Sequence, residues 1–426
     1  MRIGVLFIAA LLAAHIATAA EAWVAAWVGS AHGPYPAGNA VAQPDLQLVF
    51  PGREANDQTF RLIVKPDVWG RSARLRFTNV FGSQPVTFDE VYVGVHQGAG
   101  AVLPGTNRPV RFGEKTGVTI APGEMHYSDP VELNYADGAQ MAGRKLAVSF
   151  HVVGASGPMT WHAKAMTTSY MTRPQNGAHG REETSDAFPF TTTSWYFLDA
   201  VDMMMPAGTH VIAAFGDSIT DGTNSTINGD DRWPDFLSQR VHRALGTAWS
   251  VVNAGIGGNQ IVAPPTYDKA KPNGGGPSAL DRLDRDVLSI PGLSVVVWLE
   301  GINDLGTSGA MAESVIAGMK QGVARLHARG VKVIGATITS SLHSTATHGT
   351  AEVDARRKAV NNFIRTGGVF DGVADFDAAT LDAATGTLRP EFQPSSSTGG
   401  PGDRLHPNRA GYQAMANSID LKLFPR

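Results

Sequence analysis

The sequence contains no cysteine. This absence excludes disulfide bonds, zinc sites with thiolate ligands, cysteine nucleophiles and the lipid-attached cysteine of a lipoprotein. A chain of 426 residues that is 43% hydrophobic can still bury a large core. We therefore expect the fold to be held together by burial alone. The length favours two domains, at about 150 residues per domain.

The sequence also lacks a marked excess of charge of either sign. It has 35 Lys and Arg residues against 38 Asp and Glu residues, a formal net charge of -3 and a pI near 6.5. No long run of one sign occurs. This balance argues against nucleic acid or an anionic membrane surface as the main partner.

Long apolar runs are missing after the N-terminus. Arg2 is followed by an apolar stretch over residues 3–14 and by small residues at 17–19, a pattern typical of an export signal. An uncleaved membrane anchor is the alternative, but the apolar stretch is too short to span a bilayer. We expect a signal peptide over residues 1–20, cleaved near Ala19 or Ala20, and a periplasmic or secreted protein without a membrane anchor.

Residues 22–205, called the β-domain below, contain many short strand-like runs without helical periodicity. Gly and Pro clusters at 104–105, 122–123 and 157–158 separate these runs, and 206–208 provides a linker. This arrangement predicts a β-sandwich or jelly roll. The runs lie at residues 62–64, 73–80, 91–95, 118–120, 131–135, 146–152 and 195–201.

Residues 206–426, called the α/β-domain below, alternate strands with helices. This alternation predicts a parallel sheet with helices on both faces and a ligand site beyond the carboxyl ends of the strands. We expect strands at residues 211–215, 250–253, 293–299, 331–337 and 373–376, and helices at about 234–245, 315–326 and 353–364 and after Pro407.

Ser218 follows the first of these strands, in the sequence Gly216-Asp217-Ser218. A serine hydroxyl at a strand end, beside the N–H groups of the following turn, is suited to attack on a carbonyl. The same three residues are also an ordinary turn composition. The motif alone leaves both interpretations open.

A glycine-rich turn follows the second strand, from Asn253 through Gly257 and Gly258 to Asn259. Such a turn could bind a dinucleotide, but the fingerprint needs a glycine or alanine where Gln260 stands. No βαβ unit with an acidic partner follows either. The remaining use of these glycines is close backbone approach, which presents an N–H to a ligand.

Two further polar groups stand in the α/β-domain. Asn303 follows the strand at 293–299, where its amide could donate to an oxyanion or form an Asx turn. Asp403 precedes His406 by three residues, so its carboxylate can orient the imidazole; a helix-start carboxylate is the alternative. His343 and His348 do not match the HExxH pattern, which argues against a metal site.

These four segments, in this order, resemble the GDSL or SGNH hydrolases. The resemblance implies a flavodoxin-like three-layer fold and ester hydrolysis without a cofactor. By position it implies Ser218 as nucleophile, His406 as base and Asp403 as its orienting group. It also implies an oxyanion hole formed by the N–H groups of Ser218 and Gly258 and the amide of Asn303.

Two details qualify the resemblance. Ile219 replaces the leucine of the GDSL signature, which is a conservative change. Thr220 stands where a Gly-x-Ser-x-Gly elbow needs glycine, which argues against the ordinary α/β-hydrolases. Residues 74–82 and 128–131 resemble the β-domain of some exported bacterial SGNH esterases, including ones linked to acetylated plant polysaccharides.

We therefore expect an esterase acting on short acyl groups, such as acetyl, of small-molecule or carbohydrate esters. A lipase or lysophospholipase, or a glycan-binding protein on a degenerate hydrolase scaffold, are the alternatives. We expect the loops at 257–277 and 337–350 to shape the pocket. The aromatic residues Trp161, His162 and Trp195 could stack on sugars or could be buried core.

Overall fold

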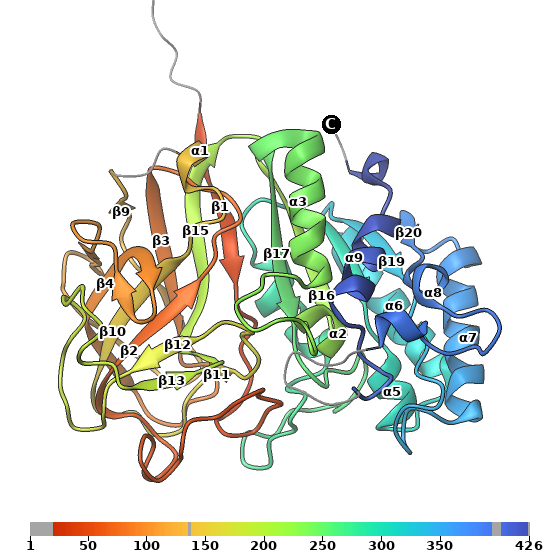
Figure 1. Cartoon of the computed structure of the whole chain (residues 1–426), viewed down its shortest axis with the longest axis horizontal. Helices are drawn as coiled ribbons and strands as arrows, with labels where there is room; N and C mark the ends of the chain where they lie inside the picture. Colours follow the sequence, from red (N-terminus) through yellow and green to blue (C-terminus); the bar gives the residue numbers. More distant parts are fainter. Residues whose placement is uncertain (1–19, 135–137, 394–401, 425–426) are drawn as a thin grey trace, which may run out of the picture.

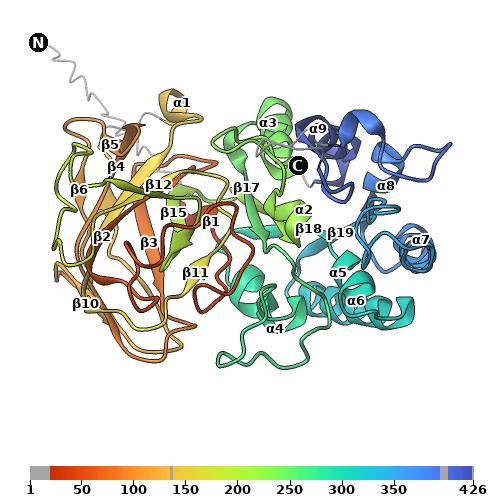
Figure 2. The same cartoon turned by 60° about the horizontal axis from the view of Figure 1, so that its bottom comes forward.

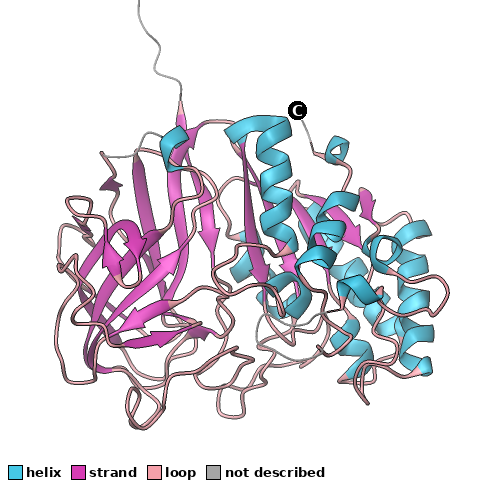
Figure 3. Ribbon diagram, viewed as in Figure 1, coloured by secondary structure: helices cyan, strands magenta, loops and turns pink. Residues whose placement is uncertain are grey.

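The computed structural model describes residues 20–134, 138–393 and 402–424. The chain forms a β-rich half and an α/β half that lie side by side (Figure 1; Figure 3). Apart from Ala20, the predicted signal peptide lies outside the described residues. Among the described residues, every helix falls short of the length and apolarity needed to cross a bilayer.

The β-domain packs two mostly antiparallel sheets against each other, as the sequence predicts. The first has the order β1 (Glu21–Val28), β15 (Leu198–Pro206), β3 (Ser72–Thr78) and β8 (Met125–Tyr127), with β9 (Val131–Glu132) also paired to β3. The second has the order β13 (Phe190–Thr192), β12 (Ser169–Met171), β2 (Asn56–Val64), β10 (Leu146–Ala155), β4 (Val86–Gly98) and β5 (Ala101–Val102), with β6 (Arg108–Pro109) and β7 (Val118–Ile120) on β4. A short helix, α1 (Gly138–Met141), precedes β10.

The α/β-domain is built on a parallel five-stranded sheet, which confirms the predicted fold class. The strand order is β17 (Trp249–Gly255), β16 (His210–Gly216), β18 (Leu293–Leu299), β19 (Lys332–Ala336) and β20 (Gly372–Ala374). In order of appearance along the chain this is 2-1-3-4-5, the flavodoxin-like order, with β16 at the point where the order reverses. Ligands of such sheets bind beyond the strand ends at that point.

Helices cover both faces of this sheet and complete three layers. Alternate residues of β16 enter different cores: Ile212 and Ala214 face one side, Val211 and Phe215 the other. One face carries α3 (Trp233–Leu245), α8 (Phe376–Thr380) and α9 (Arg409–Ser418); the other carries α4 (Ala279–Leu283), α6 (Ala312–His327) and α7 (Ala351–Thr366). Two short helices, α2 (Ser218–Asp221) and α5 (Ile302–Gly306), start just beyond strand ends.

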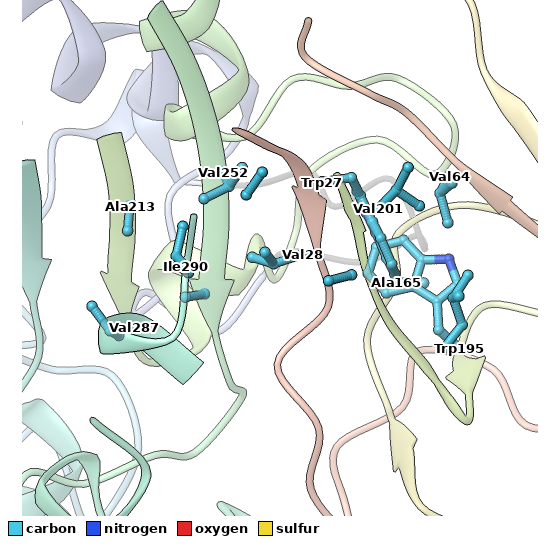
Figure 4. Packing of buried hydrophobic residues seen from close by; sticks show 14 of the residues in the cluster. Trp27, Val28, Val64, Ala165, Trp195, Val201, Ala213, Val252, Val287 and Ile290 are labelled. Carbon is cyan, nitrogen blue, oxygen red and sulfur yellow. The ribbon is translucent and has the colours of Figure 1, made fainter. Parts of the chain in front are cut away.

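The two halves share one continuous apolar core. Strand β1 lies against β17 in both views (Figure 1; Figure 2), and the contact is filled by buried residues such as Val28, Val252 and Ile290 (Figure 4). The Ser250 hydroxyl donates to the Ala25 carbonyl at 2.7 Å, and Arg285 donates to the Ala31 carbonyl at 2.7 Å. Such continuous burial fixes the β-domain relative to the strand ends of the α/β-domain.

Candidate active site

Ser218 lies just beyond the carboxyl end of β16, the second strand of the parallel sheet. The chain turns sharply there because Asp217 caps α2, its carboxylate accepting the Ile219 N–H at 2.9 Å. Gly216 makes this turn possible: a Cβ on it would lie 2.1 Å from the Leu299 carbonyl oxygen. Ser218 is therefore the first residue of a helix, where backbone N–H groups have no partner within the helix.

His406 and Asp403 extend a chain of hydrogen bonds from Ser218. The Ser218 hydroxyl lies 2.7 Å from His406 Nε2, and His406 Nδ1 lies 2.5 Å from Asp403 Oδ2. The other carboxylate oxygen accepts the backbone N–H groups of Leu405 and His406 at 3.0 and 2.9 Å. Because the carboxylate accepts the Nδ1 proton, Nε2 presents its lone pair to the serine.

The same contacts keep Asp403 ionised. Burial alone would raise its pKa, but the hydrogen bond and charge of His406, with the two backbone N–H groups, hold the pKa of Asp403 well below its usual range. An ionised carboxylate beside Nδ1 favours an imidazole that carries its proton on that nitrogen.

Gly258 and Asn303 line the same cavity as Ser218 and His406. The cavity has a volume of about 530 Å³. Asn303 follows Gly301 at the start of α5, and its Nδ2 donates to the Asn259 carbonyl at 2.9 Å. An amide nitrogen carries two protons, so one N–H remains for a group in the cavity. The structure therefore brings a serine hydroxyl, a histidine and hydrogen-bond donors together in one cavity.

The cavity is also lined by both loops expected to shape it, 257–277 and 337–350, and by residues of the β-domain that the sequence did not single out. His348 Nε2 lies 3.2 Å from Asn303 Oδ1, so it holds the acceptor end of that amide. The β-domain contributes Asn39, Ala40 and Lys164 to the cavity wall. No local pattern signals Asn39 or Lys164, because their role depends on contacts between the two halves. The remaining lining residues are Gln260, Asn273, Gly274, Gly275, Thr307 and Leu405.

Three buried carboxyl groups lie beneath the nucleophile. Burial raises the pKa of Asp217 to about 7, that of Glu300 to about 8 and that of Asp304 to about 6. Buried Arg282 crosses the same region, donating to the Gly216 carbonyl at 2.9 Å and the Ala254 carbonyl at 2.8 Å. Arg282 therefore ties the ends of β16 and β17 together.

The three aromatic residues considered for sugar stacking are buried. Trp161, His162 and Trp195 are 1%, 4% and 4% exposed, so they belong to the interior and not to a sugar-binding surface. Among residues 20–134, 138–393 and 402–424, no group of three or more His, Asp or Glu side chains is arranged to hold a metal ion.

Comparison with known proteins finds a family model that matches most of the α/β-domain. Residues 214–414 match the GDSL-like lipase/acylhydrolase family, which confirms the resemblance seen in the sequence. Comparison with curated proteins gives no match.

Solved structures similar to this chain include a GDSL-like lipase from Bacteroides thetaiotaomicron, with 17% identity, 51% of this chain and 89% of that chain covered, and a TM-score of 0.37. A member of the lipolytic G-D-S-L family from Veillonella parvula has 19% identity and a TM-score of 0.36; the match covers 49% of this chain and 95% of that chain. A catalytic mutant of an acetylxylan esterase from Geobacillus stearothermophilus has 18% identity and a TM-score of 0.36; the match covers 50% of this chain and 94% of that chain.

Proposed function

We propose that this chain, whose residues 214–414 match the GDSL-like lipase/acylhydrolase family, hydrolyses acetyl esters of carbohydrates through an acyl-enzyme formed on Ser218. The observation that carries the proposal is the hydrogen-bonded series from Ser218 through His406 to Asp403, at 2.7 and 2.5 Å, opening onto the cavity. Ester hydrolysis is the chemistry of the family. The residue roles and the substrate are our proposal.

In the first half of the reaction, His406 Nε2 removes the proton of Ser218 as its Oγ attacks the ester carbonyl carbon. The carbonyl oxygen becomes negatively charged and receives hydrogen bonds from the N–H groups of Ser218 and Gly258 and from the Asn303 amide. His406 then gives its proton to the departing alkoxide. The acyl group remains on Ser218.

In the second half, a water molecule takes the place of the alcohol. His406 removes a proton from the water as its oxygen attacks the acyl carbon, and the same donors hold the second oxyanion. Collapse of this intermediate returns the proton from His406 to Ser218 Oγ and releases the acid. Asp403 keeps the imidazole in the orientation that both halves need.

The lining of the cavity supports a short acyl group. Apart from Ala40 and Leu405, its walls are formed by polar residues and glycines. Long acyl chains bind along extended apolar walls, since burying their methylene groups supplies the binding energy. A polar cavity instead offers hydrogen-bond partners to the hydroxyl groups of a sugar.

Rates with 4-nitrophenyl acetate and 4-nitrophenyl decanoate test the acyl specificity. We expect kcat/KM to be higher for the acetyl ester; a preference for decanoate would support a lipase instead. Acetate release from a panel of acetylated oligosaccharides tests the carbohydrate part. Release no faster than from simple acetyl alkyl esters would contradict a carbohydrate substrate.

A further inference from the structure

A short segment of the β-domain reaches the nucleophile. Strand β11 (Trp161–His162) pairs with β14 (Trp195–Tyr196) on the side of the β-domain that faces α2 (Figure 2). Trp161 anchors the segment, since its indole N–H donates to the Ala37 carbonyl at 3.0 Å. His162 and Lys164 lie two residues apart, and both side chains contact the segment that follows Ser218.

His162 contacts Asp221, the last residue of α2. Its Nε2 lies 3.1 Å from Asp221 Oδ1 and its Nδ1 lies 2.8 Å from the Ser30 carbonyl oxygen. Carboxylate and carbonyl oxygens only accept hydrogen bonds here, so both ring nitrogens carry a proton and the imidazole is positively charged. Burial lowers the pKa of His162, but the charge and hydrogen bond of Asp221 outweigh this effect and raise it.

The Asp221 carboxylate also bonds to the turn that carries Gly258. Its second oxygen, Oδ2, accepts the Gly257 N–H at 2.8 Å. On the other side of the same residue, Asn39 Nδ2 donates to the Gly257 carbonyl at 3.0 Å. Gly257, the residue before the proposed oxyanion donor, is therefore held at its C=O by Asn39 of the β-domain and at its N–H by Asp221, which His162 of the β-domain contacts.

Lys164 lies beside the same turn. Its ammonium donates to Thr223 Oγ1 at 2.5 Å, and a Cβ built on Gly257 would lie 3.4 Å from its Nζ. The side chain is nearly buried, and this burial lowers the pKa of Lys164, while the carboxyl groups of Asp221, Asp403 and Asp217 oppose that effect. Lys164 thus lies among the acidic groups near Ser218.

These acidic groups create a difficulty for the chemistry. A developing oxyanion is disfavoured by nearby negative charge, and a low-dielectric site strengthens that repulsion. Asp217, Asp221 and Asp403 all come from the α/β-domain, whereas His162 and Lys164 come from the β-domain. The β-domain therefore places two basic side chains beside acidic side chains of the α/β-domain.

We propose that His162 and Lys164 of the β-domain are positioning residues for the reaction at Ser218, holding the turn at 257–258 and offsetting the surrounding carboxylates. The inference rests on the proposed function, because it takes Gly258 as an oxyanion donor. The β-domain is then part of the catalytic centre and not a separate binding module. Losing the contacts of His162 and Lys164 should therefore destabilise the transition state, which carries the oxyanion, more than the bound ester.

The test compares Lys164→Met with Lys145→Met in the full-length protein. Lys145 also bridges the two halves, with its Nζ 3.0 Å from Asp230, but it does not line the cavity. With 4-nitrophenyl acetate we expect kcat of Lys164→Met to fall about 10-fold with KM within about 2-fold, the pattern of an interaction made in the transition state. Lys145→Met should keep its kcat within about 2-fold, as expected for a contact away from the chemistry.

Two further measurements separate positioning from simple structural support. Inhibition by phenylboronic acid, which forms a tetrahedral adduct on the serine, should weaken in Lys164→Met by about the same factor as kcat. Lys164→Arg, which keeps the charge, should recover part of the activity. His162→Gln should lower kcat in the same way. If circular dichroism shows that His162→Gln is unfolded, the test rests on Lys164→Met.

The inference is wrong if Lys164→Met and Lys145→Met lose activity and thermal stability to the same extent, or if only KM changes. Asn303→Ala distinguishes this outcome from a failure of the proposed function. If Asn303→Ala loses activity and Lys164→Met does not, the result supports the proposed oxyanion hole and refutes the proposed role of the β-domain. If Asn303→Ala keeps full activity, the proposed oxyanion hole itself is wrong.

Discussion

Asn303→Ala removes one donor from the proposed oxyanion hole. The Asn303 side chain uses one N–H on the Asn259 carbonyl at 2.9 Å and receives a hydrogen bond from His348 on its oxygen at 3.2 Å, which aims the second N–H at the cavity. Losing one such donor costs about 100 to 1,000-fold in kcat, or about 3 to 4 kcal/mol of transition-state stabilisation. KM should change little, since the ester carbonyl in the ground state needs this donor less.

The same substitution also costs stability, which has to be separated from the loss of catalysis. Asn303 is 6% exposed, and losing its two hydrogen bonds costs about 1 kcal/mol each. Asn361→Ala is a matched control, because buried Asn361 also makes two hydrogen bonds, both to Ile338, and does not line the cavity. We expect similar losses of Tm in both variants and a loss of kcat only in Asn303→Ala.

Stopped-flow measurement of the acylation burst with 4-nitrophenyl acetate gives the rate of the first chemical step in each variant. An acylation rate of Asn303→Ala within about 3-fold of the unchanged protein would refute the assignment, since a lost oxyanion donor costs far more.

Three further outcomes are expected. Asp403→Asn should lower kcat about 10,000-fold while the fold persists by circular dichroism, because an amide at Nδ1 imposes the wrong imidazole tautomer; a loss under about 10-fold would contradict the role of Asp403. Glu300 binds its proton more tightly when folded, with its pKa raised by burial from 4.5 to about 8, so its contribution to the free energy of unfolding falls as the pH rises through that interval; urea unfolding should show a flatter pH dependence in Glu300→Gln, and an unchanged slope would contradict this. Mass spectrometry of the exported protein should find its N-terminus next to Ala19 or Ala20, just before β1; an intact residue 1 would contradict the predicted signal peptide.

The sequence predicted the α/β-domain well, because its signals are local. Each strand is a compact apolar run, and the polar residues Ser218 and Asn303 follow two of them within four residues. Parallel strands end at one edge of the sheet, so residues far apart in sequence could be expected to meet there. Asp403 and His406 could also be paired from the sequence, because a spacing of three residues places both on one turn.

The contribution of the β-domain to the site could not be predicted. Strand β1 was missed because most of its residues are buried, between β15 and the α/β-domain, so it lacks the alternation of a half-exposed strand. Lys164 looks in sequence like an ordinary surface lysine, and its burial beside Gly257 depends on how the two halves dock. Contacts of this kind have no local signature.

The most direct test of the mechanism is to trap the acyl-enzyme. The protein is mixed with 4-nitrophenyl acetate, quenched in acid within the burst, digested and mapped by mass spectrometry. We expect one acetyl group on the peptide that contains Ser218, and none on that peptide in Ser218→Ala, which should also show no turnover. An acetyl group found only elsewhere, or full turnover by Ser218→Ala, would contradict nucleophilic catalysis by Ser218.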